Sequence, residues 1–162
     1  MLENFWYAVE FSQALSDRPQ LVQIFGQQIA LFRDSSGKAQ ALNNICPHRG
    51  ASLGLGKVQD NCLVCPYHGW HFAGNGQCVK IPSNLPGATI PQRAQVKTYP
   101  VREKDGWIWL FWGDATIADT VKIPDIPQVD EVGLRSITGD FHWHVNYERA
   151  MDNGLDFAMR RL

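Results

Sequence analysis

Two short segments of the chain each combine a cysteine with a histidine, and both residue types bind metals. They are Cys46-Pro47-His48 and Cys65-Pro66-Tyr67-His68, so that the full pattern reads C-x-H-x16-C-x2-H. Two loops that each carry one thiolate and one imidazole suit a shared centre, in which the thiolates bind one iron and the imidazoles the other. In a 2Fe-2S cluster, this exchange of two anionic thiolates for neutral histidines raises the reduction potential from about −400 mV into a range of roughly −150 to +300 mV.

The residues around these side chains favour two stiff loops. A proline follows each cysteine, and Gly50 and Gly69 allow backbone amides to approach closely. The sequences C-P-H-R-G and C-P-Y-H-G-W resemble the cluster-binding loops of Rieske 2Fe-2S domains, most closely those of Rieske-type non-haem iron oxygenases, an aromatic ring-hydroxylating and demethylating family. The similarity covers roughly residues 5–112. The disulfide of respiratory Rieske proteins is not expected, because Ala51 and Tyr67 stand at the matching places.

The resemblance also implies a set of metal ligands. Cys46 and Cys65 are expected to bind the inner iron of the 2Fe-2S cluster, and His48 and His68 the outer, more exposed iron. On spacing alone, a two-Cys, two-His zinc site remains an alternative, although structural zinc sites favour a C-x2–4-C start.

Four other residues in this region, two cysteines, a histidine and a tryptophan, could also contribute to a site. Cys62 and Cys78 are interpreted as buried free thiols that act as small hydrophobic residues. His71 is interpreted as a strand residue rather than a ligand. Trp70 has two interpretations that stay open, a core residue or a shield between the cluster and water.

Length and charge limit the classes of protein. A chain of 162 residues holds one domain, or one domain and part of another. Fifteen basic and sixteen acidic residues give a net charge of −1, without a Lys- or Arg-rich run, so a nucleic-acid partner is not expected. The longest apolar run, Trp107–Trp112, is far shorter than the roughly 20 residues of a membrane span. The first residues show no secretory signal, and a cytoplasmic location is expected.

Short β-rich runs separated by turn residues dominate the first 112 residues and predict an all-β domain of small antiparallel sheets. Predicted hairpins span 21–33 about Gly26-Gln27, 58–64 about Asp60-Asn61, 70–81 about Gly74-Asn75-Gly76 and 96–112 about Lys104-Asp105-Gly106, and 39–43 is a further strand. Three of these turns place Asn or Asp beside Gly or Asn, residues that tolerate positive φ. The proline-rich segment Pro82–Pro91 is predicted to be an irregular loop.

After residue 112, the short β-rich runs give way to a linker and then to a helical pattern. The predicted domains are 1–112 as the Rieske domain, 113–133 as a linker and 134–162 as a short α+β segment, with a strand over 134–145 and a helix from Tyr147. The last segment resembles the start of the helix-grip catalytic domain of Rieske oxygenases, whose iron motif reads N-x-x-D-x-x-H-x4-H. Asp156 then matches a carboxylate that bridges cluster and mononuclear iron, whereas Met159 stands at the first histidine. A mononuclear non-haem iron is therefore expected only in a complete family protein.

The resemblance implies one-electron transfer as the electron-accepting part of a Rieske oxygenase, which in complete form oxidises an aromatic or other ring compound with O2. Its partners would be a reductase or ferredoxin that donates electrons, and further copies of the chain in a homo-oligomer. A stand-alone Rieske ferredoxin is the main alternative, but it does not require the residues after Trp112. Whether this chain is itself an enzyme stays open, because it lacks the mononuclear iron site.

Overall fold

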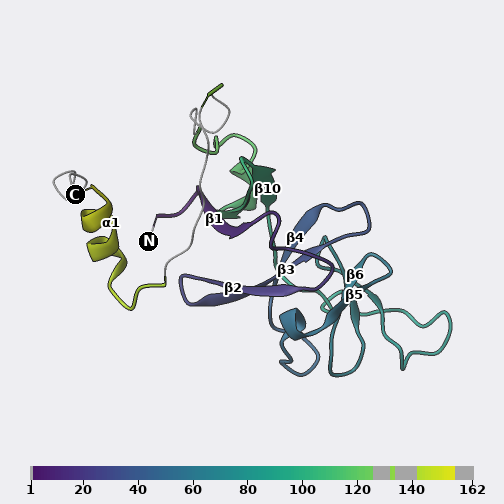
Figure 1. The fold of residues 1–162 in the computed structure, drawn as a ribbon. Helices are drawn as coiled ribbons and strands as arrows, with labels where there is room; N and C mark the ends of the chain where they lie inside the picture. The colour runs from purple at the N-terminus through teal and green to yellow at the C-terminus, as the bar shows by residue number, and fades with distance from the viewer. Residues whose placement is uncertain (1, 126–131, 134–141, 156–162) are drawn as a thin grey trace. The chain divides into compact units, whose positions relative to one another are not determined.

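The computed structural model describes residues 2–125, 132–133 and 142–155. The chain divides into two compact units, Met1–Ile126 and Pro127–Leu162. The first unit contains all the strands of the described residues, and the second contains one α-helix (Figure 1).

Three small antiparallel sheets make up the first unit, which confirms the predicted all-β domain. The first sheet has the order β1-β11-β10, with strands Phe5–Phe11, Trp107–Trp112 and Val101–Lys104. The second has the order β2-β3-β4-β9, with strands Gln20–Ile24, Gln27–Arg33, Ala39–Asn43 and Thr98–Tyr99. The third has the order β5-β6-β7-β8, with strands Lys57–Gln59, Cys62–Val64, His71–Ala73 and Cys78–Lys80. Short 3-10 helices cover Leu53–Leu55 and Ala115–Ile117.

Three hairpins turn through two residues that both have positive φ, the geometry that matches the twist of antiparallel strands. Asp60-Asn61 and Asp105-Gly106 do so at the predicted places. The β2–β3 turn falls on Phe25-Gly26, one residue earlier than predicted, although a phenylalanine with φ of 49° is unusual. The aromatic rings of Tyr7 and Trp112 contact Phe25 and hold it there.

Two differences from the predicted strands have plain causes. The expected strand over residues 96–103 is divided into β9 and β10 at Pro100, which has no amide to donate to a neighbour. Strand β1 was not predicted at all. It pairs with β11, about a hundred residues further along the chain, and so depends on a partner that local sequence does not reveal.

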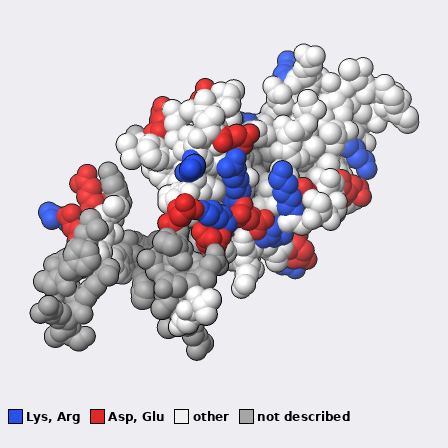
Figure 2. All heavy atoms as spheres, turned by 90° about the horizontal axis from the view of Figure 1, so that it is seen from above, with Lys and Arg blue, Asp and Glu red and all other residues white. Residues whose placement is uncertain are grey.

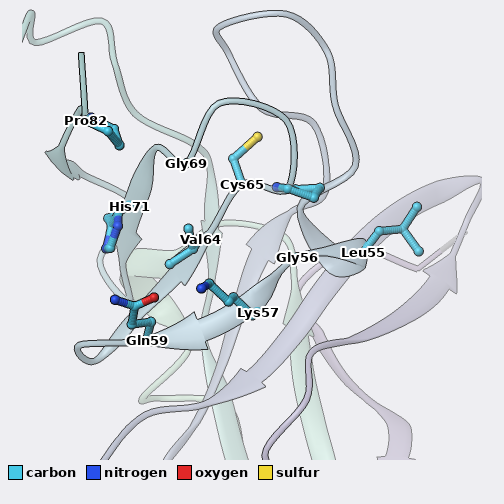
Figure 3. A pocket seen from close by; sticks show the side chains of 10 residues that line it. Leu55, Gly56, Lys57, Gln59, Val64, Cys65, Gly69, His71 and Pro82 are labelled. Carbon is cyan, nitrogen blue, oxygen red and sulfur yellow. The ribbon is translucent and has the colours of Figure 1, made fainter.

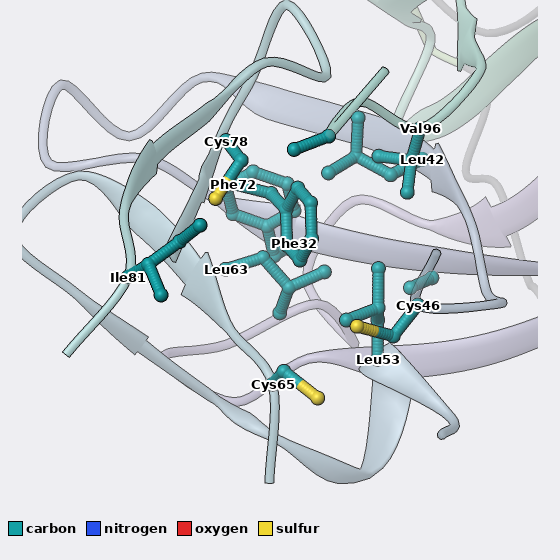
Figure 4. Packing of buried hydrophobic residues seen from close by; sticks show 12 residues of the cluster. Phe32, Leu42, Cys46, Leu53, Leu63, Cys65, Phe72, Cys78, Ile81 and Val96 are labelled. Atoms are coloured by element: carbon teal, nitrogen blue, oxygen red, sulfur yellow. The ribbon is translucent and has the colours of Figure 1, made fainter. Parts of the chain in front are cut away.

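A buried cluster of apolar side chains lies beside the two cysteines of the Cys-His segments (Figure 4). Phe32 and Leu42 come from the second sheet, and Leu63 and Phe72 from the third, and all four are fully buried. Cys46 and Cys65 are members of the same cluster. The loops are therefore anchored by hydrophobic packing between two sheets.

The segment that follows β11 packs against the first sheet. Ala118 and Ile123 are buried with Trp6 of β1, whose indole nitrogen donates to the carbonyl of Val121 at 2.8 Å. This stretch was expected to begin a linker over 113–133, and its first part, as far as residue 125, lies within the first compact unit. The predicted domain boundaries stay a prediction.

The second unit contains helix α1, Tyr147–Leu155, which begins where the apolar periodicity predicts a helix. The Asn146 side chain accepts a hydrogen bond from the Glu148 amide at 2.9 Å and caps the helix. The predicted strand over 134–145 lies mostly outside the described residues, and its described end, 142–145, is not a strand. A strand needs a hydrogen-bonded neighbour, and none of the described strands pairs with this segment. Asp156 and Met159 lie outside the described residues.

Candidate metal centre

The first Cys-His segment forms a tight loop between β4 and the 3-10 helix Leu53–Leu55. The Cys46 amide donates to the carbonyl of Ala51 at 2.9 Å, and the Gly50 amide donates to the carbonyl of Cys46 at 2.9 Å. Gly50 has a φ of 72°, a conformation that costs most side chains energy. A single bridge between Ile45 and Ser52 closes the base of the loop.

The second Cys-His segment repeats the same backbone pattern between β6 and β7. The Cys65 amide donates to the carbonyl of Trp70 at 2.9 Å, and the Gly69 amide donates to the carbonyl of Cys65 at 3.0 Å. Gly69 has a φ of 67°, close to that of its counterpart. The pairing of Val64 with His71 closes the base of this loop. Two loops with equivalent hydrogen bonds therefore present the two cysteines in equivalent backbone settings.

The two thiols lie together in the interior. Cys46 and Cys65 are 1% and 3% exposed, and their side chains are hydrogen-bonded to each other. Burial, and secondarily the neighbouring Cys65, raises the pKa of Cys46 to about 11, although the backbone amides of His48 and Arg49 donate to its sulfur. A metal that binds here must displace the protons of these thiols. Its positive charge favours the thiolate form and so drives this loss of protons.

The two imidazoles lie together at the surface. His48 and His68 are exposed, and their ring centroids are 4.6 Å apart. The His48 ring stacks on Trp70 at 4.6 Å with an interplanar angle of 6°, and the His68 ring lies 3.8 Å from that of Tyr67. Desolvation, and then the charges of His68 and Arg49, lower the pKa of His48. A neutral imidazole is the form that binds a metal.

This arrangement meets the needs of a 2Fe-2S cluster. Two buried thiols beside two exposed imidazoles match an inner iron with sulfur ligands and an outer iron with nitrogen ligands. Among the residues that the structure describes, no three His, Cys, Asp or Glu side chains are grouped to hold a single ion. A binuclear cluster needs only two side chains for each iron, because its sulfides supply the other ligands. The residues present therefore fit the cluster, although the assignment of all four as ligands stays a prediction.

The structure also places the cysteines, the histidine and the tryptophan near the two loops that were not assigned to the cluster. Cys62 and Cys78 are buried and free, and His71 lies on β7, as expected. That His71 is not a ligand stays a prediction. Trp70 packs against the buried cluster of apolar side chains, which confirms the first interpretation, and its ring stacks on that of His48. Its role as a shield between the cluster and water stays a prediction.

A buried asparagine that the sequence did not single out supports the first loop. Asn44 is 2% exposed, and its side-chain oxygen accepts hydrogen bonds from the Gly54 amide at 2.8 Å and the Ser52 hydroxyl at 3.0 Å. Its side-chain nitrogen donates to Gln28 of β3 at 3.1 Å. Asn44 thereby connects the sheet to the residues that follow the first loop. An asparagine at the end of a strand is typical of a turn, so the sequence carries no distinct signal for this role.

Surface charge and helix length complete the description. On the face shown in Figure 2, Lys and Arg side chains lie among Asp and Glu side chains. Among the described residues, no helix has the length and apolar character needed to cross a membrane.

Comparison with known proteins identifies relatives along most of the chain. It is 45% identical over 132 residues to the 4beta-methylsterol monooxygenase of Methylococcus capsulatus, covering 80% of this chain and 36% of that protein. It is 37% identical to the oxygenase component of dicamba O-demethylase from Stenotrophomonas maltophilia, covering 97% of this chain and 46% of that protein. A crystal structure of dicamba monooxygenase bound to dicamba superimposes with a TM-score of 0.91 at 35% identity, covering 99% of this chain and 48% of that one.

The chain thus spans about half or less of the length of these relatives. A family model described as the Rieske [2Fe-2S] domain matches residues 5–100, which include both Cys-His loops. Such a domain implies a 2Fe-2S cluster, as the motif predicts. With this match, the shared fold and the two equivalent loops, the chain belongs to the Rieske [2Fe-2S] domain family.

Proposed function

We propose that the first unit accepts and passes on single electrons through a 2Fe-2S cluster held by Cys46, Cys65, His48 and His68. The observation that carries this proposal is the pair of equivalent loops, which places two thiols together in the core and two imidazoles together at the surface. The cluster supplies the one-electron chemistry when it is bound.

The residues of the chain have separate tasks in this function. The thiolates of Cys46 and Cys65 bring negative charge to a buried position, where hydrogen bonds from the amides of His48 and Arg49 to the Cys46 sulfur offset part of its cost. The imidazoles of His48 and His68 provide the exposed edge at which an electron enters or leaves. Trp70 stacks on His48 and excludes water from one side of that ring.

In the whole protein, we propose that this part serves a Rieske oxygenase. The names of the relatives refer to a monooxygenase and to the oxygenase component of a demethylase. The similarity to the demethylase component extends over 97% of this chain, beyond the Rieske domain. This extent supports the oxygenase over a stand-alone ferredoxin. The complete protein would use a mononuclear iron to oxidise an aromatic or other ring compound with O2, and Asp156 would bridge the cluster to that iron.

The partners and the location belong to the same proposal. Electrons would come from a reductase or ferredoxin, in keeping with the term oxygenase component, and the chain would assemble as a homo-oligomer. Cys62 and Cys78, the cysteines outside the cluster, are free thiols, which supports a reducing compartment and therefore a cytoplasmic location. The mixed charge on the face shown in Figure 2 gives no support for a nucleic-acid partner.

Iron and acid-labile sulfide analysis of the purified chain tests the proposal. We expect two irons and two sulfides for each chain, and an electron paramagnetic resonance signal that appears only after reduction with dithionite. Cys46→Ser should lose both iron and signal, and Cys62→Ser, which alters another buried thiol outside the loops, should retain them. Stoichiometric zinc without sulfide, or iron retained in Cys46→Ser, would contradict the proposal.

A further inference from the structure

A pocket of about 490 Å³ lies beside the second Cys-His loop, and the proposed electron transfer does not use it (Figure 3). Strands β5, β6 and β7 supply Lys57, Gln59, Val64 and His71, and the adjoining segments supply Leu55, Gly56, Cys65, Pro66, Gly69 and Pro82. The Cys65 sulfur points away from Lys57 and His71 (Figure 3). The polar groups of the pocket are therefore separate from the thiol that is assigned to the cluster.

Strand register gathers basic side chains on this face of the third sheet. Lys57 pairs with Val64, Val64 with His71, and His71 with Lys80, so that the four residues form one row across four strands. Cross-strand partners project from the same face of a sheet. The row therefore places three basic residues on one face, and one carboxylate, that of Asp60, also acts on the His71 ring.

The imidazole of His71 lies at the wall of this pocket. Its side chain is 5% exposed, and no described residue hydrogen-bonds to its ring nitrogens. Burial, followed by the charge of Lys80, lowers its pKa, which favours a neutral ring with one N–H to donate. The ring nitrogens retain some contact with solvent, so the N–H can donate to an acceptor that enters the pocket.

Two further donors of the pocket are available for an acceptor. The Lys57 ammonium makes no ion pair with any residue that the structure describes. The Gln59 amide nitrogen donates to Asp60 at 3.3 Å, which leaves its second N–H free. Figure 3 shows the Lys57 and Gln59 side chains next to each other on the side of the pocket where His71 also lies.

We propose that this pocket binds a small oxyanion, a carboxylate or phosphate group, through the Lys57 ammonium, the Gln59 amide and the His71 N–H. An anion that accepts from a charged donor and two neutral donors forms a charge-assisted hydrogen bond with the lysine and gives the imidazole N–H an acceptor. The oxyanion has two possible sources, a free small anion or an acidic side chain of another protein. Three donors of this kind suit either source.

Calorimetric titration of the full chain at low ionic strength tests the proposal, with inorganic phosphate, acetate and a capped tetraglutamate peptide as probes. We expect saturable binding of at least one probe, about tenfold weaker in Lys57→Gln, since one charge-assisted hydrogen bond is lost. Gln59→Ala should weaken binding less. Lys38→Gln, which removes the same charge from the exposed β3–β4 turn, should bind as the unchanged chain does.

The comparison of probes separates the two sources. A peptide that binds at least tenfold more tightly than acetate supports the side chain of a partner, and equal binding supports a free anion. The absence of saturable binding with all three probes, or equal affinity in the unchanged chain and Lys57→Gln, would overturn the proposal. Both lysines are exposed, so melting temperatures should remain unchanged and verify that the variants are folded.

Iron analysis of the same samples keeps this proposal separate from the proposed function. A chain that binds phosphate but holds no iron supports the oxyanion site and contradicts the electron-transfer function. A chain that holds the cluster but binds no probe supports the electron-transfer function and contradicts the oxyanion site. If both are right, the bound anion beside the Cys65 loop makes reduction harder, and phosphate lowers the midpoint potential in the unchanged chain but not in Lys57→Gln.

Discussion

At the scale of single residues, the proposed metal site has two ligands in the interior, where a charge is costly to bury, and two at the surface, where it is solvated. The thiols of Cys46 and Cys65 are buried, where a raised pKa keeps the Cys46 thiol protonated until a metal replaces the proton. The imidazoles of His48 and His68 are exposed, where one electron can be exchanged with a partner. The same four residues were identified from the sequence, because cysteine and histidine at this spacing are typical of a metal site. Their common location could be established only from the fold.

Trp70 allows a direct test of the aromatic shield at His48. Trp70→Leu removes the stacked ring, and Trp70→Phe retains an aromatic face of smaller area. We expect the cluster of Trp70→Leu to be lost several times faster in air, with Trp70→Phe intermediate, because water reaches the exposed side of the site. The decay of visible absorbance measures this rate. Equal decay in all three proteins would show that Trp70 is only a core residue.

Asn44 shows how a supporting residue escapes sequence analysis. Asn44→Ala leaves the buried Gly54 amide without its partner and removes the link to Gln28, and we expect a loss of about 1–3 kcal/mol in the free energy of unfolding. Urea denaturation measures this loss. Asn84→Ala, at an exposed loop position, should change the free energy by less than about 0.5 kcal/mol. Equal stability of the two variants would mean that Asn44 does not support the first loop.

At the scale of elements, turns were predictable where the residues themselves favour positive φ. Asp60-Asn61 and Asp105-Gly106 fall where expected, because Asp, Asn and Gly adopt the left-handed region readily. Phe25 does not, and its turn depends on aromatic contacts with Tyr7 and Trp112 that are distant in sequence. Strand β1 also depends on a remote partner. Local propensity therefore predicts the hairpins, and only tertiary packing explains the exceptions.

The left-handed glycines of the two loops provide a test at this scale. Gly50 has a φ of 72° and open space around the position of a Cβ, so substitution there strains the backbone without a steric clash. Gly50→Val should lower the free energy of unfolding by about 1–2 kcal/mol, and Gly50→Asn by less, because asparagine tolerates this region. Thermal unfolding of the metal-loaded protein measures both. If valine and asparagine have equal effects, positive φ is not what the loop requires.

At the scale of the whole molecule, one arginine joins two sheets of the first unit. Arg33 on β3 hydrogen-bonds to both carboxylate oxygens of Glu103 on β10, at 2.8 and 3.0 Å. It also donates to the carbonyls of Leu15, Ser12 and Gly37. The hydrogen bond from Arg33 is the largest factor that lowers the pKa of Glu103. The loops of the metal site depend on this framework, because the second sheet carries the strand that precedes the first loop.

This contact predicts a dependence of stability on pH. Because the pKa of Glu103 is lower in the folded than in the unfolded state, its stabilisation is complete above the unfolded pKa and is lost as the pH falls through the folded pKa. Glu103→Gln should therefore cost up to about 1 kcal/mol near neutral pH, and the difference from the unchanged chain should shrink in acid. Urea denaturation at several pH values measures it. A difference that grows on acidification would contradict this assignment.

The central claim is that two thiolates hold one iron and two imidazoles hold the other. A Mössbauer spectrum of the oxidised protein, purified from cells grown with iron-57, distinguishes the two irons directly. Two doublets of equal area are predicted, because sulfur and nitrogen ligands give the irons different electronic surroundings. A single doublet, or protein without bound iron, would contradict the account.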